Sequence, residues 1–181
     1  MISLEWVKDY IDISDQDLEE LAVKITQSGI NVEKVITNHI NNLVIGEVLE
    51  CVAHPDSDHL HVCKVNVGNI TEQIVCGAPN VREGLKVIVA LPGAVLPGDF
   101  EIKKSKIRGV ESNGMLCALY ELGLEEKNDE TYAKGIEELG ADAPVGEDPL
   151  KYLGLDDTLY ELDIHNTETM IVTTTLVLLM K

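Results

Sequence analysis

The chain has 181 residues, of which 45% are hydrophobic and 4% are aromatic, and its formal net charge at pH 7 is −18. This length allows one ordinary domain or a compact domain with a smaller partner segment, and the apolar content excludes wholesale disorder. The net charge argues against a general nucleic-acid binder, because contacts to phosphate require Lys and Arg.

The first 40 residues predict a small helical cap that is followed by a strand. Ser3 is placed to cap a short helix that reaches Tyr10. Ser14 begins a second helix, whose apolar face is formed by residues at helical spacing: Leu18, Leu21, Ala22 and Ile25. Gly29 ends this helix, and a strand follows over residues 32–36.

From residue 43 the pattern changes to short strands that are separated by turn residues. The predicted strands are residues 43–51, 60–67, 71–76, 86–91, 101–107 and 112–117. The second and third form a hairpin around Gly68-Asn69. Five or six short strands at this spacing are typical of a small closed barrel of the oligonucleotide-binding (OB) kind, although periodicity alone leaves a sandwich open.

Beyond Gly123 the sequence becomes acidic and loop-like, with a helical turn over residues 149–153 and a strand over 158–163. The predicted fold is therefore mainly β with a small α+β cap, an OB barrel inserted in an incomplete α+β domain. The expected divisions are 1–40, the first segment of the split domain; 41–150, the OB domain; and 151–181, the return segment.

The cysteine pattern favours free thiols. The four cysteines form no CxxC pair, and no signal peptide precedes them, so a reducing cytoplasm with mostly buried thiols is expected: Cys51, Cys63, Cys76 and Cys117. Four neighbouring residues could together bind a metal ion: His54, His59, His61 and Cys63. Zinc sites usually draw a second pair of ligands from elsewhere in the chain, and no such pair is evident, so no metal is predicted. Residues 171–180 are apolar but too few to cross a bilayer.

The basic residues are concentrated in the centre of the chain. Residues 41–123 hold seven basic and ten acidic residues, whereas residues 1–40 hold three and eight, and residues 124–181 hold four and fourteen. Four of the central bases fall within six positions: Lys103, Lys104, Lys106 and Arg108. Such a cluster is either a solvated edge or a contact for an anionic partner.

Three central segments resemble the tRNA-binding domain shared by phenylalanine–tRNA ligase β subunits and several freestanding tRNA-binding proteins. They are IVCGAPN (74–80), VALPGAVLP (89–97) and IKKSKIRGVESNGMLCAL (102–119). The flanking segments resemble the β subunit in particular: SLEWVKDYIDI and LAVKITQSGINVEKV before the barrel, and DAPVGEDPLKYLGLDDTLYELDI after it. The resemblance covers residues 1–164.

This resemblance implies a non-catalytic, cytoplasmic tRNA-binding module of the ligase. The residues that it places at the RNA are Asn80, Arg82, Lys103, Lys104, Lys106, Arg108, Ser112 and Met115. It implies tRNA and the ligase α subunit as partners, and no membrane. No catalytic site and no cofactor are expected in this chain, because the ATP- and magnesium-dependent aminoacylation site of such a ligase belongs to the α subunit.

The last residues, IHNTETMIVTTTLVLLMK, do not resemble the family, and a shifted reading frame is one explanation. In that frame the junction of Met170 with Ile171 requires an Asp codon, and that of Met180 with Lys181 a Glu codon. The junctions between them permit Cys-Tyr-Tyr-Tyr-Phe-Gly-Val-Ala-Tyr, which resembles the family's continuation. We therefore expect a truncated or frameshifted carboxyl terminus from about residue 165; a divergent terminus is the alternative.

With such a terminus, helical side chains of the first segment are expected to be poorly covered: Trp6, Leu18, Leu21 and Ile25. Two other functions stay open. The chain is alternatively a freestanding RNA-binding or chaperone-like module, or a protein-interaction module whose acidic surface serves the ligase α subunit.

Overall fold

The computed structural model describes residues 2–37 and 39–163, and the chain forms two compact units. The first unit combines the chain up to His39 with the chain from Gly154 onward, and the barrel unit is Ile40–Leu153. The aberrant terminus predicted from about residue 165 lies outside the described residues.

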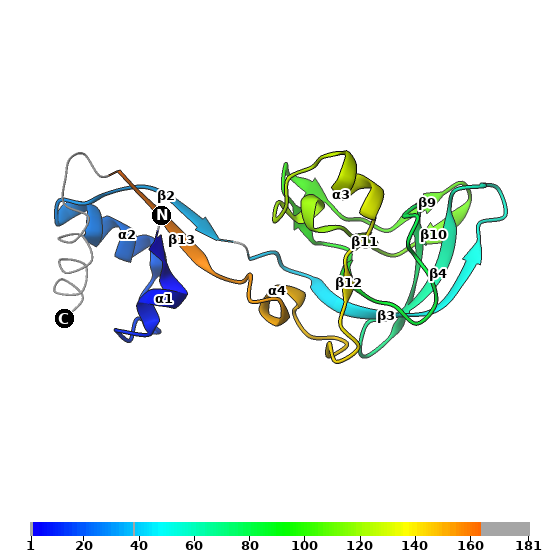
Figure 1. The fold of residues 1–181 in the computed structure, drawn as a ribbon, viewed down its shortest axis with the longest axis horizontal. Helices are drawn as coiled ribbons and strands as arrows, with labels where there is room; N and C mark the ends of the chain where they lie inside the picture. The colour runs from blue at the N-terminus through cyan, green and yellow to red at the C-terminus, as the bar shows by residue number, and fades with distance from the viewer. Residues whose placement is uncertain (1, 38, 164–181) are drawn as a thin grey trace. The chain divides into compact units, whose positions relative to one another are not determined.

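In the first unit, two helices pack on a small antiparallel sheet (Figure 1). Its elements are β1 (Ile2–Ser3), α1 (Leu4–Lys8), α2 (Leu18–Gln27), β2 (Asn31–Thr37) and β13 (Thr158–Asp163). The strand order is β1-β13-β2, so β13 joins strands from the other end of the sequence. The sheet therefore needs both segments of the chain.

The N-cap of α1 agrees with the prediction from the sequence, whereas the N-cap of α2 differs from it. The Ser3 hydroxyl accepts the backbone N–H of Trp6, which confirms the predicted cap of α1. The predicted start of the second helix at Ser14 is wrong, because the Asp17 carboxylate accepts the N–H groups of Glu19 and Glu20. A carboxylate at this position also interacts favourably with the helix dipole.

The core of the first unit is better covered than the sequence suggested. Leu21 and Ile25 are buried, and Leu18 is half-buried, around the fully buried ring of Tyr160. The expectation that these side chains are poorly covered is therefore wrong, whereas Trp6 is indeed exposed. The reason is that β13 brings Tyr160 under α2, where its hydroxyl donates to the carbonyl oxygen of Leu18.

The barrel unit is mainly β, and its main sheet is curled. Its strands are β3 (Leu43–Ala53), β4 (His61–Asn66), β5 (Thr71–Cys76), β6 (Lys86–Ala90), β7 (Val95–Leu96), β8 (Phe100–Glu101), β9 (Ser105–Ile107), β10 (Val110–Ser112), β11 (Met115–Cys117) and β12 (Glu138–Leu139). The helices are α3 (Asp129–Lys134), α4 (Pro149–Tyr152) and the 3₁₀ turn η1 (Leu119–Leu122). The main sheet has the order β11-β6-β3-β4-β5, and β12 adds to β6.

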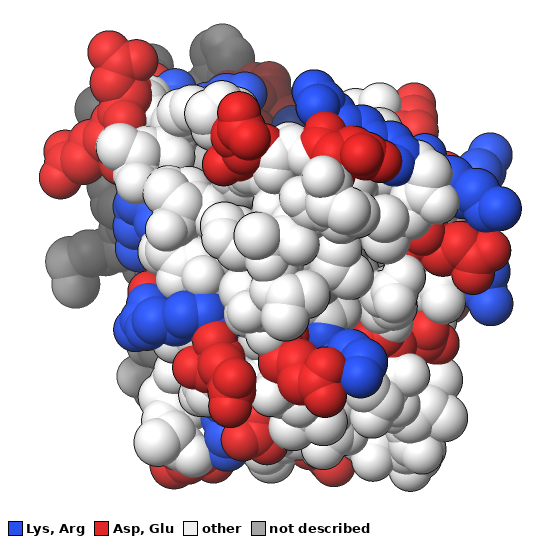
Figure 2. Space-filling view, turned by 90° about the vertical axis from the view of Figure 1, so that its right-hand side faces the viewer, with Lys and Arg blue, Asp and Glu red and all other residues white. Residues whose placement is uncertain are grey.

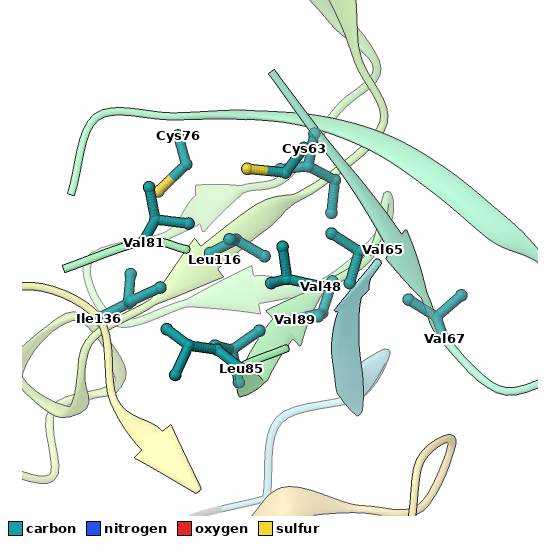
Figure 3. Close-up of a cluster of buried hydrophobic side chains, with 12 residues drawn as sticks. Val48, Cys63, Val65, Val67, Cys76, Val81, Leu85, Val89, Leu116 and Ile136 are labelled. Carbon is teal, nitrogen blue, oxygen red and sulfur yellow. The ribbon is translucent and has the colours of Figure 1, made fainter. Parts of the chain in front are cut away.

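Hydrogen bonds bring the two edges of this sheet together. Ser112 Oγ accepts the N–H of Val75, and the N–H of Asn113 donates to the carbonyl oxygen of Gln73. Both bonds join the edge strand β5 to residues just before the other edge strand β11, Ser112 at the end of β10 and Asn113 after it. Inside the curl, aliphatic and cysteine side chains from facing strands form the core (Figure 3).

Gly46 in β3 is required by this packing. A Cβ atom there would lie 2.5 Å from Val89 Cγ2 and 2.7 Å from Val65 Cγ1, closer than side chains can approach. The strand can therefore cross the core only with glycine at this position.

Two predicted strands are each split into shorter ones: that over residues 101–107 is interrupted at residues 102–104, and that over 112–117 at residues 113–114. Arg108 and Gly109 both have positive φ, 48° and 85°, and form the two-residue turn of the β9–β10 hairpin. Gly114, with φ 147°, separates β10 from β11. The prediction of a loop over residues 125–130 is wrong at its end, because α3 begins at Asp129 with Asn128 as its N-cap.

Candidate nucleic-acid interface

The clustered cations lie on and beside the β9–β10 hairpin, and all four side chains are exposed. Lys103 Nζ lies 2.7 Å from Glu101 Oε2, and Lys106 Nζ lies 3.7 Å from Glu111 Oε1. Exposed ion pairs of this kind contribute roughly 0–1 kcal/mol, so an incoming phosphate can replace the carboxylate at little cost. The hairpin cations, Lys103, Lys104, Lys106 and Arg108, are thus available to an anionic partner.

The charges of the barrel unit are mixed rather than uniformly positive. Figure 2 shows one face of it, where basic side chains lie beside acidic ones around a broad area without charge. Attraction of a polyanion must therefore be local and strongly screened by salt, because the Debye length is about 8 Å at physiological ionic strength.

A buried histidine fixes the hairpin to the loop between β3 and β4. His54 Nδ1 accepts the backbone N–H of Asp56 at 3.0 Å, so the ring proton is on Nε2, which donates to the carbonyl oxygen of Ile107 at 3.1 Å. Arg108 reinforces the junction, because its Nη1 donates to the carbonyl oxygen of Asp56 at 2.9 Å. The cations are thus carried by an anchored hairpin.

Asn80 and Arg82 hold the segment that leads into β12. The Asn80 amide donates to the carbonyl oxygen of Ile136 at 2.8 Å and accepts its N–H at 3.0 Å, as a neighbouring strand would. Both terminal nitrogens of Arg82 donate to the Glu138 carboxylate at 2.9 Å. This pair raises the pKa of Arg82 and lowers that of Glu138, through hydrogen bonding in both cases.

Ser112 and Met115 lie further inside. The Ser112 side chain is buried, and its hydroxyl donates to the carbonyl oxygen of Gly114 while it accepts the N–H of Val75. Met115 is half-buried at the start of β11 and lines a groove. The structure thus places four of the predicted residues on or beside an exposed hairpin. Asn80, Ser112 and Met115 are half-buried or buried, whereas Arg82 is exposed and paired with Glu138.

That groove, which we call the aromatic groove, is a hollow of about 880 Å³ in the barrel unit. Its walls come from the end of β5 and the turn after it, from the segment of β8 and β9, from β11, and from α3 and the residues after it. Three aromatic side chains line it: Phe100, Tyr120 and Tyr132. Lys103 and Met115 also line it, so the groove adjoins the hairpin cations.

Two titratable groups of the aromatic groove are perturbed by burial. Burial raises the pKa of the Tyr120 phenol, and burial also raises the pKa of Glu121. The Glu121 carboxylate is held by the N–H of Ala118 at 2.8 Å.

Sequence reasoning missed the three aromatic side chains of this groove. They lie at positions 100, 120 and 132, and only the fold brings them together. The only signal in the sequence was the small number of aromatic residues, one Trp, five Tyr and one Phe, which makes each of them worth considering as a binding residue.

The cysteines are free, as predicted, and three of them are buried. Burial raises the pKa of Cys76 to about 11 and also raises the pKa of Cys63 and of Cys117. Within residues 2–37 and 39–163, no three His, Cys, Asp or Glu side chains cluster as metal ligands would. No helix in that part of the chain is long and apolar enough to span a membrane.

Residues 43–148 match the family model described as "Putative tRNA binding domain". The chain is also similar to proteins named phenylalanine–tRNA ligase beta subunit. It is 48% identical over 168 residues to that of Geobacillus kaustophilus, and 51% identical over 169 residues to that of Oceanobacillus iheyensis. Each alignment covers 91% of this chain and 21% of the relative, so the chain spans about one fifth of their length.

Among solved structures, the chain is similar to the "MetRS related protein from Pyrococcus horikoshii", with a TM-score of 0.42 and 23% identity. That alignment covers 57% of this chain and 84% of the other.

Proposed function

This chain belongs to the tRNA-binding domain family, and we propose that it binds tRNA as the amino-terminal module of a phenylalanine–tRNA ligase β subunit. The observation that carries the proposal is the exposed β9–β10 hairpin, which presents clustered cations and is fixed by His54 to the neighbouring loop. It lies within the residues that match the family.

The fold proposed for the barrel unit is an OB fold. The strand order β11-β6-β3-β4-β5 supports it, as do the hydrogen bonds that join the two edges of the sheet. OB folds are five-stranded, partly open barrels that bind oligonucleotides on one face.

The domain organisation that goes with this function is an insertion. Residues 1–40 and 151–181 are two segments of one split α+β domain, and the OB domain, residues 41–150, is inserted between them. The pairing of β13 with both β1 and β2 supports this division, because it joins the two segments in one sheet.

Different predicted residues have different roles in this proposal. The hairpin cations meet phosphates directly: Lys103, Lys104, Lys106 and Arg108. The remaining residues position the surface from behind or line its groove: Asn80, Arg82, Ser112 and Met115. The burial of Asn80, Ser112 and Met115 supports this second role, as do the hydrogen bonds of Asn80 to Ile136, of Arg82 to Glu138 and of Ser112 to Val75.

The ligase α subunit is the protein partner in this proposal, which the name of the relatives, beta subunit, supports. Aminoacylation of tRNA with phenylalanine, with its ATP and magnesium, then belongs to the complete ligase. The test of the function is a mobility shift of labelled tRNA by the purified chain at low salt, with unlabelled tRNA and duplex DNA as competitors. A shift that unlabelled tRNA abolishes at a lower concentration than duplex DNA supports tRNA binding. The absence of any shift contradicts it.

A further inference from the structure

The aromatic groove presents rings to solvent that a domain core would normally bury. Phe100 is 56% exposed and Tyr132 is 65% exposed, although this chain has few aromatic residues. Exposed rings that gather around one hollow indicate a binding surface, since each buries a large apolar area on contact.

A cation stands at these rings. Lys127 Nζ lies 5.5 Å from the ring centroid of Tyr120 and 5.8 Å from that of Tyr132, within the range of cation–π attraction. Lys103 lines the groove as a second cation, paired with Glu101 at 2.7 Å. Two cations thus lie at or beside the rings, together with the Glu101 and Glu121 carboxylates of the lining.

The floor between the rings is apolar. It is lined by side chains such as Val75, Met115 and Ile136, while the Glu121 carboxylate is engaged by a backbone N–H. Aromatic faces over an apolar floor suit planar bases, and cations at the rim suit the phosphates between them. A duplex cannot use such a groove, because its bases are stacked inside the helix.

We propose that the aromatic groove is a stacking site for unpaired nucleotides of RNA, distinct from the hairpin cations that contact the backbone. This inference rests on the proposed tRNA binding and adds its substrate class: a loop or single-stranded end, rather than a helical stem. Phe100 and Tyr132 supply the stacking faces, and Lys127 supplies a cation beside them.

The first test compares two labelled RNA probes on the full chain: a single strand of about ten nucleotides, which fits one such barrel, and a blunt duplex of the same length. We expect the single strand to bind more tightly at equal salt. A 2-aminopurine placed in the single strand should lose fluorescence on binding, because stacking quenches it. Tighter binding of the duplex, or an unchanged 2-aminopurine signal on binding, would overturn the proposal.

The second test asks whether binding requires the aromatic rings of Phe100 and Tyr132 or only apolar side chains at these positions. The double variant Phe100→Leu/Tyr132→Leu should weaken single-strand binding at least about tenfold, because base–aromatic stacking is lost. Phe100→Tyr/Tyr132→Phe keeps both rings and should bind like the parent. Tyr10→Leu, at a tyrosine that is 66% exposed in the first unit, is the matched control and should change nothing.

The outcomes also distinguish this inference from the function on which it rests. If tRNA binds and the leucine variant binds every probe like the parent, the stacking site is wrong and tRNA binding stands. If no RNA binds, both are wrong. If purified ligase α subunit protects Tyr132 from iodination and single-stranded RNA does not, the groove is a protein site and the inference is overturned.

Discussion

His54 donates its Nε2 proton to the carbonyl oxygen of Ile107 at 3.1 Å, across 53 residues of sequence. Its other ring nitrogen accepts the backbone N–H of Asp56. One buried side chain thus ties the β3–β4 loop to the hairpin that carries the clustered cations. In the proposed function, this contact orients the phosphate-binding side chains.

Replacing His54 should loosen the hairpin. His54→Ala removes a donor and an acceptor and leaves two partly buried backbone groups without this partner, so the free energy of unfolding should fall by about 1–3 kcal/mol. Denaturant unfolding and hydrogen exchange at the amides of residues 105–112 measure this. His59→Ala, at an exposed histidine of the same loop, is the control. Equal stability of the two variants would show that the contact is unimportant.

A substitution at Asn80 tests whether this residue, which was expected to contact RNA, instead holds the segment around Ile136 in place. Asn80→Ala should destabilise the chain by about 1–3 kcal/mol and speed exchange at Ile136, because both backbone groups of Ile136 lose a partner. Asn69→Ala, at an exposed turn residue, should have little effect. A large loss of tRNA affinity with unchanged stability would instead make Asn80 a direct contact.

The buried phenol of Tyr160 should make the free energy of unfolding fall at high pH. Burial raises its pKa from 10.0 to about 12, so the folded chain keeps a proton that the unfolded chain releases. Its contribution is complete below pH 10 and is lost as the pH rises towards 12. Tyr160→Phe should flatten this decline and remove the last part of the tyrosinate absorbance titration. Tyr10→Phe should leave both in place; a Tyr160→Phe variant with the parental pH profile would contradict the assignment.

The isolated chain should not activate phenylalanine. The proposed function places the nucleotide-handling residues outside these 181 residues, so phenylalanine-dependent exchange of pyrophosphate into ATP should stay at the background rate. A complete ligase of the same family is the positive control. Exchange by the purified chain, at a rate proportional to its concentration, would mean that a catalytic site lies within it.

The sequence predicts regular elements well and long-range contacts poorly. The strands at 71–76 and 158–163 have the predicted bounds. The strands predicted over residues 101–107 and 112–117 are interrupted at residues 102–104 and 113–114. The turn between the two predicted strands has Arg108 at positive φ, which propensity does not suggest.

In the candidate site, too, the local features could be predicted from the sequence and the long-range contacts could not. The cation cluster is local and could be read from the sequence. The His54–Ile107 and Asn80–Ile136 contacts join residues more than fifty positions apart, and the three rings of the aromatic groove come from separate segments. No local pattern encodes these contacts, because they depend on how the sheet curls.

The central claim is that tRNA binds through the hairpin cations. The measurement is tRNA affinity against salt for the parent and for a variant with Lys103→Ala, Lys104→Ala, Lys106→Ala and Arg108→Asn, where asparagine tolerates the positive φ. The control removes four exposed lysines elsewhere: Lys8, Lys24, Lys34 and Lys151. Both variants change the net charge equally.

We predict that the hairpin variant loses detectable binding at low salt, or that the slope of log affinity against log salt falls by about 3, as expected when four phosphate contacts are removed. The control should keep a slope close to that of the parent. Equal affinity and equal slope for the parent and the hairpin variant would contradict the account.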